Sequence, residues 1–573
     1  TGAVSIFGTG LLDLNSGTDT IAALTVNATN AGVDADAVRN LGSLTVSSLT
    51  LTPDDTYTTT VATGAGTLVL NGNATFNAAG SGRAVISGNL SLNNASRTFT
   101  VGDGLAADDL RISAAITSGT LVKAGEGGLV LSGSNSFAGG VTLSAGLLDV
   151  SNAWALGSGT LTITSTSGSA LLGNSSGGAV TVAGNNAQVW NGSFGYAGPN
   201  ALDLGDGNVT GTASSLTVSS GTLGVRGVFA VSNMTKSGAG VLSLGGSGTN
   251  TFTNLTVSQG RLDLAKNGTG VAVNSGTLTI GSGATARYTG DSTNMLADTV
   301  GVTINGSGLL DVGGRSDAVG ALTVNAGGLA VGGTSSANAD SSPLQNVGSL
   351  TVSSLTVTPL TGFVTTLDTG TGTLALGGAG TFNAAGWGRT VIAGNFSLAG
   401  GNRTLTVNDG TADDDLTISA AISSGTLTKA GAGRLVLSGS NSYAGGTTLS
   451  AGQLDLRNGW ALGTGLFTIT SGTLANGSGG AVTVAGDNAQ AWNGSFGYAG
   501  PNALDLGAGN VTGTASSLTV TVSSGTLGAR GAIAVSNMTK SGTGVLSLGG
   551  SGTNTGTNLT ARWNWRRTAR AWH

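Results

Sequence analysis

Two short stretches of the sequence concentrate carboxylates in a way that could bind a metal ion. VGDGLAADDL at 101–110 and VNDGTADDDL at 407–416 carry aspartates at corresponding positions, namely Asp103, Asp108, Asp109, Asp409, Asp414 and Asp415. Carboxylate oxygens gathered on a turn are ligands that calcium prefers. The spacing fits neither the EF-hand loop nor the nine-residue calcium β-roll repeat, and aspartate is also an ordinary turn residue. A calcium site and a solvated turn therefore both stay open, and calcium is the only cofactor considered.

Aromatic residues make up only 4% of the chain but gather at two places. NGSFGYAGPNALDLG at 191–205 recurs unchanged at 493–507, and a tryptophan precedes each copy. The aromatic set is Trp190, Phe194, Tyr196, Trp492, Phe496 and Tyr498. Exposed, these rings would stack on sugars or contact a protein; buried, they would fill the end of a coil or cover a bulge. Trp154 and Trp460 each follow an apolar strand, and we assign them to the core.

A lysine stands before each of four glycine-rich turns. These residues are Lys123, Lys236, Lys429 and Lys540. A lysine near an aspartate could be the base of a polysaccharide lyase, a chemistry that parallel β-helices host. Recurrence in all four copies instead favours a feature of the repeat. We interpret these lysines as charges that keep a sheet edge from pairing with another chain.

The rest of the composition excludes most catalytic and cofactor chemistry. The chain has no Cys, and its single His is His573, so disulfides, thiolate metal sites and Ser-His-Asp triads are ruled out. The net charge of −5 argues against binding to nucleic acid, which needs clustered Lys and Arg. No run of about 18 apolar residues marks a transmembrane helix. We expect a protein that is not an enzyme, has no nucleic-acid partner, and meets a membrane only through an anchor or barrel outside these residues.

The sequence contains the same block twice. GSLTVSSLTLTP at 42–53 returns as GSLTVSSLTVTP at 348–359, and VSNMTKSGAGVLSLGGSGTNT at 231–251 returns with one change at 535–555. We divide the chain into a first solenoid repeat block over 1–298, a second over 299–560 and an aberrant tail over 561–573. Shorter units lie inside the blocks, at 119–150 and 234–264 in the first and at 425–456 and 538–559 in the second. Such internal repeats are typical of stacked arrays.

Within each unit, apolar residues alternate with polar ones, as Leu129 and Leu131 do. This period of two predicts half-buried strands of four to six residues. Gly-Gly, Ser-Gly and Asn-Gly pairs, which favour tight turns, separate the strands. Very short strands without a domain boundary favour a solenoid over a sandwich or propeller. The predicted fold is all-β, a right-handed parallel β-helix (β-solenoid).

The units at 119–150 and 425–456 resemble the autotransporter-associated β-strand repeat, also called the passenger-associated transport repeat. The resemblance lies in the Gly-x-Gly-x-Leu-x-Leu-x-Gly core, the turn at Asn441–Thr448 and the closing Gly-x-Leu-x-Leu. Proteins of this family are β-helical passengers of secreted or surface-displayed bacterial proteins, and many act as adhesins or stalks. The resemblance implies export and display at the outer membrane. Family members normally end in a β-barrel translocator, and no such pattern is seen in this sequence.

The tail ARWNWRRTARAWH at 561–573 differs in composition from everything before it. It starts where the first block continues RLDLAKNGTGVA at 261–272. Back-translated and read two bases later, the tail permits almost the same residues as that continuation. We therefore expect a shift of reading frame near residue 560; the alternative is a short basic tail that binds an anionic partner.

The function we expect is that of a structural stalk or adhesin, extracellular and displayed on the bacterial surface. Its partner would be a glycan or a protein on a host or neighbouring cell. Two alternatives remain: a β-helix that binds or cleaves polysaccharide, and a self-assembling extracellular fibre whose subunits associate end to end.

Overall fold

The computed structural model describes residues 2–27, 36–39, 42–165, 168–326, 342–345, 347–550, 554–555, 558–561 and 565–567. These residues contain strands and turns and no helix. The chain folds as two compact units. Unit 1 comprises Thr1–Gly276 with Thr289–Met295, and unit 2 comprises Thr277–Tyr288 with Leu296–His573. Together they hold about 23 turns of a parallel β-solenoid, which confirms the predicted fold class.

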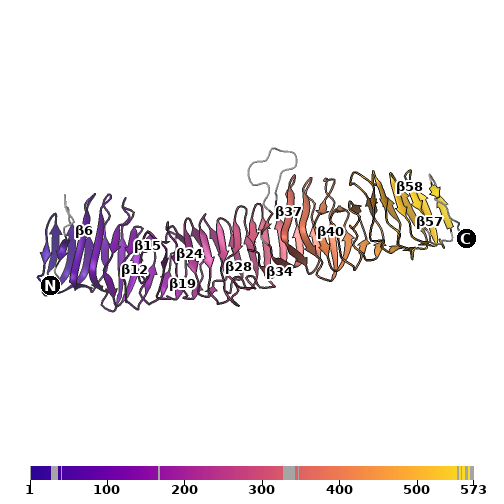
Figure 1. Ribbon diagram of the computed structural model, residues 1–573. Helices are drawn as coiled ribbons and strands as arrows, with labels where there is room; N and C mark the ends of the chain where they lie inside the picture. Colours follow the sequence, from indigo (N-terminus) through magenta and orange to yellow (C-terminus); the bar gives the residue numbers. More distant parts are fainter. Residues whose placement is uncertain are drawn as a thin grey trace. The chain divides into compact units, whose positions relative to one another are not determined.

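In unit 1 the strands form three ladders of parallel neighbours (Figure 1). The first ladder contains β1(Ala3–Phe7), β3(Thr18–Asn27), β5(Ser43–Leu51), β7(Ala74–Phe76), β9(Ser96–Val101), β12(Thr120–Ala124), β14(Val141–Leu143), β16(Leu161–Ile163), β19(Gln188–Trp190), β22(Val209–Gly211) and β25(Phe229–Ala230). The second contains β2(Leu12–Asp13), β4(Asp36–Arg39), β6(Thr58–Leu70), β8(Arg83–Ser91), β10(Leu110–Ile112), β11(Ala115–Thr117), β13(Gly128–Leu131), β15(Leu147–Val150), β17(Leu171–Gly173), β20(Phe194–Tyr196), β23(Ser215–Val218), β26(Asn233–Ser237) and β28(Asn254–Val257). The third contains β18(Val180–Thr181), β21(Leu202–Asp203), β24(Thr222–Val225), β27(Val241–Leu244) and β29(Arg261–Leu264).

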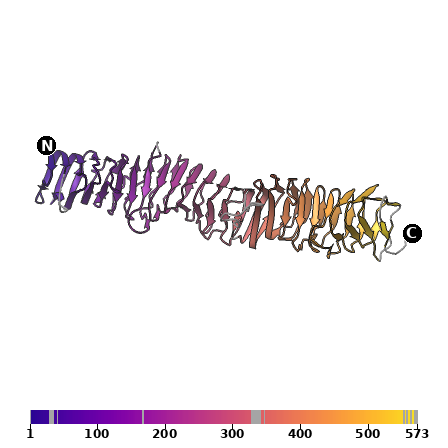
Figure 2. The ribbon, with the colours of Figure 1, turned by 90° about the horizontal axis from the view of Figure 1, so that it is seen from above.

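Unit 2 repeats this arrangement (Figure 2). Its first ladder contains β30(Thr277–Ile280), β32(Gly301–Asn305), β34(Ser316–Asn325), β36(Ser349–Val357), β38(Gly380–Phe382), β40(Asn402–Val407), β43(Thr426–Ala430), β45(Thr447–Leu449), β47(Phe467–Ile469), β50(Gln490–Trp492), β53(Val511–Thr512) and β56(Ile533–Ala534). The second contains β37(Val364–Leu376), β39(Arg389–Ser397), β41(Leu416–Ile418), β42(Ala421–Ser423), β44(Arg434–Leu437), β46(Gln453–Leu456), β48(Thr473–Ala475), β51(Phe496–Tyr498), β54(Leu518–Val522), β57(Asn537–Ser541) and β59(Asn558–Ala561). The third holds β31(Thr285–Tyr288), β33(Leu309–Asp311) and β35(Leu344–Gln345), and separately β49(Val482–Thr483), β52(Ala503–Asp505), β55(Thr526–Ala529), β58(Val545–Leu548) and β60(Trp565–Arg567).

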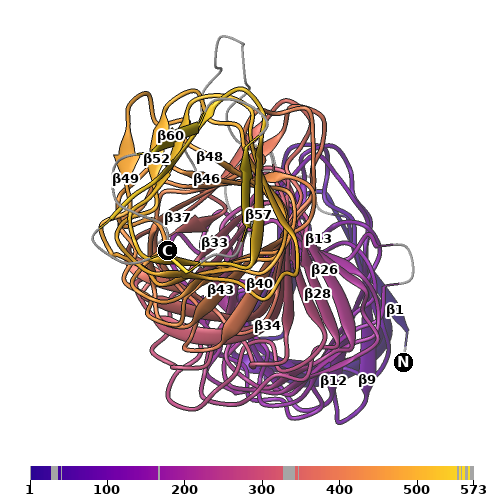
Figure 3. The ribbon, with the colours of Figure 1, turned by 90° about the vertical axis from the view of Figure 1, so that its right-hand side faces the viewer.

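The core of each unit is built by the period-two alternation (Figure 3 looks along the stack). In β5 the residues Leu44, Val46, Leu49 and Leu51 are all buried, while their neighbours face outward. Because parallel pairing keeps the register from coil to coil, each inward residue stacks on an inward residue of the next coil. The interior is therefore a set of continuous apolar columns.

Glycine closes the tight turns between strands where the backbone turns left-handed. Gly125 and Gly431 both have φ of 77°. A Cβ at either position would lie 2.3 Å from the carbonyl oxygen of Val101 or Val407 on the preceding coil, so only glycine fits there. These two turns carry the carbonyl groups that hold the repeat's lysines.

Candidate functional site

The lysines of the repeat point into the solenoid. Lys123 is fully buried, and its Nζ donates to the carbonyl oxygens of Ala124 at 3.1 Å, Gly125 at 2.6 Å and Ala145 at 3.0 Å. Ala124 ends β12, Gly125 lies in the turn that follows it, and Ala145 lies in the turn of the next coil. We call this arrangement, an ammonium held by backbone carbonyls of two coils, a lysine cage.

Unit 2 contains a matching cage. Lys429 Nζ donates to the carbonyls of Ala430 at 2.9 Å, Gly431 at 2.7 Å and Ala451 at 3.1 Å. The three hydrogen bonds use all three N–H groups of an ammonium, and each pairs the buried ammonium with a part-buried carbonyl of a turn or strand end. The cage therefore holds one coil to the next at a turn.

Further lysines of the chain are buried in the same way. Lys236 Nζ donates to Gly238 at 2.6 Å, Gly240 at 2.6 Å and Gln259 at 2.9 Å, and Lys540 donates to Gly542. Lys266 is also fully buried and lies 3.5 Å from the carbonyl of Gly227. Burial lowers the pKa of Lys123, Lys236, Lys266 and Lys429 to about 8.

These positions correct the interpretation of the lysines as edge charges. A side chain with no exposed surface cannot repel another chain, nor can it meet a polysaccharide substrate. The alternation of inward and outward residues could have predicted this burial. Leu121 and Lys123 are two residues apart on β12 and so share the inward face. The usual preference of charges for solvent was the wrong guide here.

The aspartates of the predicted calcium site serve the backbone and neighbouring arginines. Asp109 accepts from the N–H of Gly104 at 2.9 Å and of Gly128 at 2.7 Å, and burial raises its pKa. Asp108 lies 2.9 Å from Arg111 and 3.4 Å from Arg83. Asp103, in contrast, is exposed.

The second copy is arranged similarly. Asp415 accepts from the N–H of Gly410 at 2.9 Å and of Arg434 at 2.7 Å, and Asp414 lies 2.8 Å from Arg457. Asp409 is exposed. Among the described residues no group of three or more acidic side chains is placed to hold a metal ion. Asp109 and Asp415 thus bond backbone N–H groups, whereas Asp108 and Asp414 pair with arginines.

The aromatic set is in the core. Trp190, Tyr196, Trp492 and Tyr498 have no exposed surface, and Phe194 and Phe496 are 3% and 4% exposed. The rings pack edge to face, with centroids 4.7 Å apart for Trp190 and Phe194 and 5.1 Å apart for Trp492 and Phe496. These rings therefore form no exposed stacking surface, and the buried alternative holds for all six. Trp154 and Trp460, assigned to the core, are instead 45% and 44% exposed.

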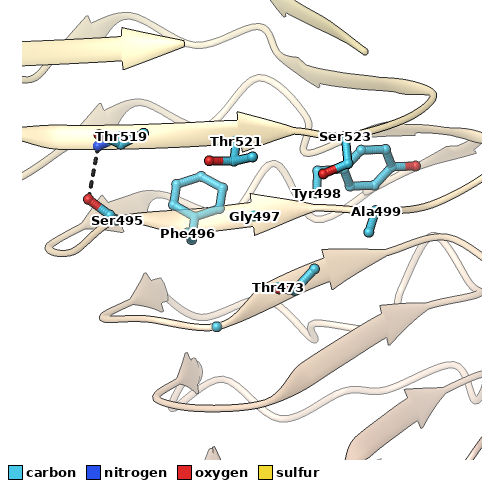
Figure 4. Close-up of a pocket in the computed structure, with 10 residues that line it drawn as sticks. Thr473, Ser495, Phe496, Gly497, Tyr498, Ala499, Thr519, Thr521 and Ser523 are labelled. Carbon is cyan, nitrogen blue, oxygen red and sulfur yellow. Dashed lines mark hydrogen bonds between the residues drawn. The ribbon is translucent and has the colours of Figure 1, made fainter. Parts of the chain in front are cut away.

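A hollow of about 410 Å³ opens on the outer face of unit 2 (Figure 4). Its floor is Gly497 of β51, which pairs with Thr473 on one side and Thr521 on the other. The lining residues are Gly472, Thr473, Ser495, Phe496, Gly497, Tyr498, Ala499, Thr519, Thr521 and Ser523. Since Phe496 and Tyr498 are buried, hydroxyl and methyl groups make up the side-chain surface that the hollow presents.

The same place in unit 1 is covered. Gly195 pairs with Leu171 and Thr217, so Leu171 stands where unit 2 has Thr473. A Cδ atom of Leu171 lies 2.6 Å from the position that a Cβ on Gly195 would take. The leucine side chain thus fills the space that the threonine leaves open.

A family model of the passenger-associated-transport-repeat matches the chain at 61–79, 121–150, 234–264 and 427–456. The chain carries the repeat of autotransporter passengers. No significant match was found among curated proteins or among solved structures. The four matches and the β-solenoid together indicate an autotransporter passenger domain, and such repeats imply secretion to the cell surface.

Three matched segments of the chain coincide with predicted units, and each contains a lysine cage. The segment at 61–79 was not recognised from the sequence and has no lysine. Its buried polar side chain is Thr63, whose hydroxyl donates to Ser87 O at 3.1 Å and accepts from Asn89 N at 2.6 Å. The unit predicted at 538–559 is not among the matches, although Lys540 is buried as in the others.

The tail predicted to be out of frame lies mostly outside the described residues, with 561 and 565–567 described as backbone only. Within the described part of the passenger no helix is long and apolar enough to cross a membrane.

Proposed function

We propose that this passenger is a non-catalytic stalk and adhesin, displayed outside the bacterial cell. The observation that carries the proposal is the lysine cage, which occurs in both units with the same backbone acceptors. The buried ammonium of each cage is out of reach of a substrate, and its hydrogen bonds hold one coil to the next. A stack of such coils resists bending and holds its outer face away from the cell.

The function needs no cofactor and no nucleic-acid partner. Its partner is a glycan or protein on a host or neighbouring cell, met by side chains of the outer face. End-to-end association into fibres is the alternative that competes with adhesion.

Display and adhesion are tested on the producing bacterium. An impermeant protease added to intact cells should remove the passenger, as detected with antibodies to unit 1. A strain lacking the passenger should adhere less to host or neighbouring cells, and restoring the full chain should restore adhesion. A passenger protected inside intact cells would overturn the proposal, as would unchanged adhesion. Release of sugars from a polysaccharide by the purified chain would replace it with a catalytic function.

A further inference from the structure

The hollow at Gly497 is a candidate ligand site on the outer face of unit 2. We propose that it binds one neutral sugar ring of a glycan. This inference rests on the proposed adhesive function and names both the site and the ligand class.

The chemistry of the lining selects the ligand. Hydroxyls come from Thr473, Ser495, Thr519, Thr521 and Ser523, on or next to three stacked strands. Each hydroxyl can both donate and accept, which is the capacity needed to pair with the hydroxyls of a sugar. No charged side chain is among the described residues that line the hollow, so a phosphate, a carboxylate or a metal ion has no counter-charge there.

The shape also suits a single ring. The hollow measures about 410 Å³ and is shallow and open, so it would contact one face of a ring without enclosing it. The methyl groups of Thr473, Thr521 and Ala499 offer apolar contact for the C–H face of a sugar. Ser495 and Ala499 are exposed, so the hollow opens to solvent on a lateral face of the coils.

The missing side chain at 497 creates the site. A Cβ on Gly497 would lie 3.1 Å from Thr473 Oγ1 and 3.4 Å from Thr473 Cγ2. Any larger residue at 497 would therefore occupy the centre of the hollow. The backbone there is extended, so a valine is allowed once the Thr473 side chain shifts by a few tenths of an ångström.

Unit 1 provides a matched control within the same chain. Ser193, Gly195, Ala197, Ser215, Thr217 and Ser219 occupy the positions that correspond to Ser495, Gly497, Ala499, Thr519, Thr521 and Ser523. Leu171 in place of Thr473 closes this second copy. A single exchange should therefore remove the site from unit 2, and the reverse exchange should create one in unit 1.

The test uses the purified full chain and two probes. Saturation-transfer difference NMR is recorded with glucose, galactose, mannose, fucose and N-acetylglucosamine, and a glycan array compares neutral with sialylated and sulfated glycans. We expect the natural chain to bind at least one neutral sugar. Thr473→Leu, which copies unit 1, and Gly497→Val should each weaken binding at least tenfold. Leu171→Thr should raise the number of sites from one to two.

Circular dichroism confirms that each variant remains folded, and Thr473→Leu is the safest of them because unit 1 already holds a leucine there. No binding of neutral sugars by the natural chain would overturn the inference. So would binding confined to charged glycans, or binding that Thr473→Leu leaves unchanged. Cells that display Thr473→Leu separate the two proposals: full adhesion by these cells would overturn the sugar site and leave the adhesive function standing.

Discussion

The two units are near-copies in sequence, yet their interiors and outer faces have diverged to different degrees. The cages of Lys123 and Lys429 use equivalent acceptors, at 3.1, 2.6 and 3.0 Å in unit 1 and at 2.9, 2.7 and 3.1 Å in unit 2. Outside, Leu171 covers a glycine in one unit and Thr473 leaves the corresponding glycine open in the other. The lysine cage is thus the same in both units, whereas the outer face beside this glycine differs between them.

A corner of the surface, formed by residues 54 and 81 in unit 1 and by residues 360 and 387 in unit 2, also differs between the units. Ser81 and Asp54 of unit 1 correspond to Trp387 and Leu360 of unit 2. Trp387 is 61% exposed and Leu360 is 46% exposed. The corner is thus polar in unit 1 and apolar in unit 2, although the flanking strands β6 and β8 have the same lengths as β37 and β39.

The largest effect should follow from breaking the shared interior. Lys123→Met and Lys429→Met each remove three hydrogen bonds to part-buried carbonyls, and each should cost about 3–5 kcal/mol at about 1–1.5 kcal/mol per bond. Hydrogen exchange should report faster opening of β12 and β14 in the first variant, and of β43 and β45 in the second. Equal losses are expected because the cages match.

Lys266→Met is the control for that pair. Lys266 is as deeply buried but lies 3.5 Å from its acceptor, so its replacement should cost less than either cage lysine. A loss at 266 as large as at 123 would mean that filling the core, not the carbonyl bonds, gives the lysines their value.

The next effect should appear in unit 2 alone and should depend on pH. Asp317 is buried against Tyr288, whose hydroxyl donates to it at 2.7 Å, and it also accepts from the N–H groups of Leu296 and Ala318. Burial, aided by the charge of Asp298, raises the pKa of Asp317 to about 6. Its counterpart in unit 1, Asp19, is exposed.

Because the folded chain binds this proton more tightly than the unfolded chain, the stabilisation is complete below about pH 4 and is lost as the pH rises through 6. The shift of about two units corresponds to about 3 kcal/mol. Urea midpoints at pH 4 and pH 7 should differ for the natural chain and for Asp19→Asn, and the difference should shrink in Asp317→Asn. A midpoint for Asp317→Asn that follows the natural chain at both pH values would contradict this assignment.

Much of the fold could be predicted from the sequence, because the alternation of apolar and polar residues within short repeats indicates which side chains face inward. Leu44 and Val46 follow that rule, and so does Lys123, whose burial was missed because charge was given more weight than periodicity. The hollow could not be foreseen in the same way. It depends on Leu171 or Thr473 lying beside a particular glycine of the next coil, and only the register between coils shows which residues are neighbours.

A smaller effect should come from a buried pair that differs between the units. The hydroxyl of Tyr443 lies 2.6 Å from Thr447 Oγ1, whereas unit 1 has Phe137 and Val141 at these positions. Tyr443→Phe and Thr447→Val should each cost about 1 kcal/mol, because the remaining hydroxyl keeps only a longer bond to a backbone carbonyl. Thr447 Oγ1 would still donate to Leu462 O at 3.5 Å, and the Tyr443 hydroxyl to Ala461 O at 3.3 Å. The double variant, which copies unit 1, should recover most of that loss, as a double-mutant cycle of urea unfolding would measure. Additive losses would show that the two hydroxyls do not depend on each other.

The smallest effect on stability should come from the apolar corner. Trp387→Ser restores the residue of unit 1 at a position that is mostly exposed, so the unfolding free energy should change by no more than about 0.5 kcal/mol. The same substitution should reduce the binding of a hydrophobic dye, because it removes the largest apolar side chain of the corner. Ser81→Trp should have the opposite effect on dye binding in unit 1, again with little change in stability. A large loss of stability in Trp387→Ser would mean that the indole supports the coil beneath it. Substitutions on the outer face would then change stability as well, and the variants at Gly497 and Thr473 would need their unfolding free energies measured beside their sugar binding.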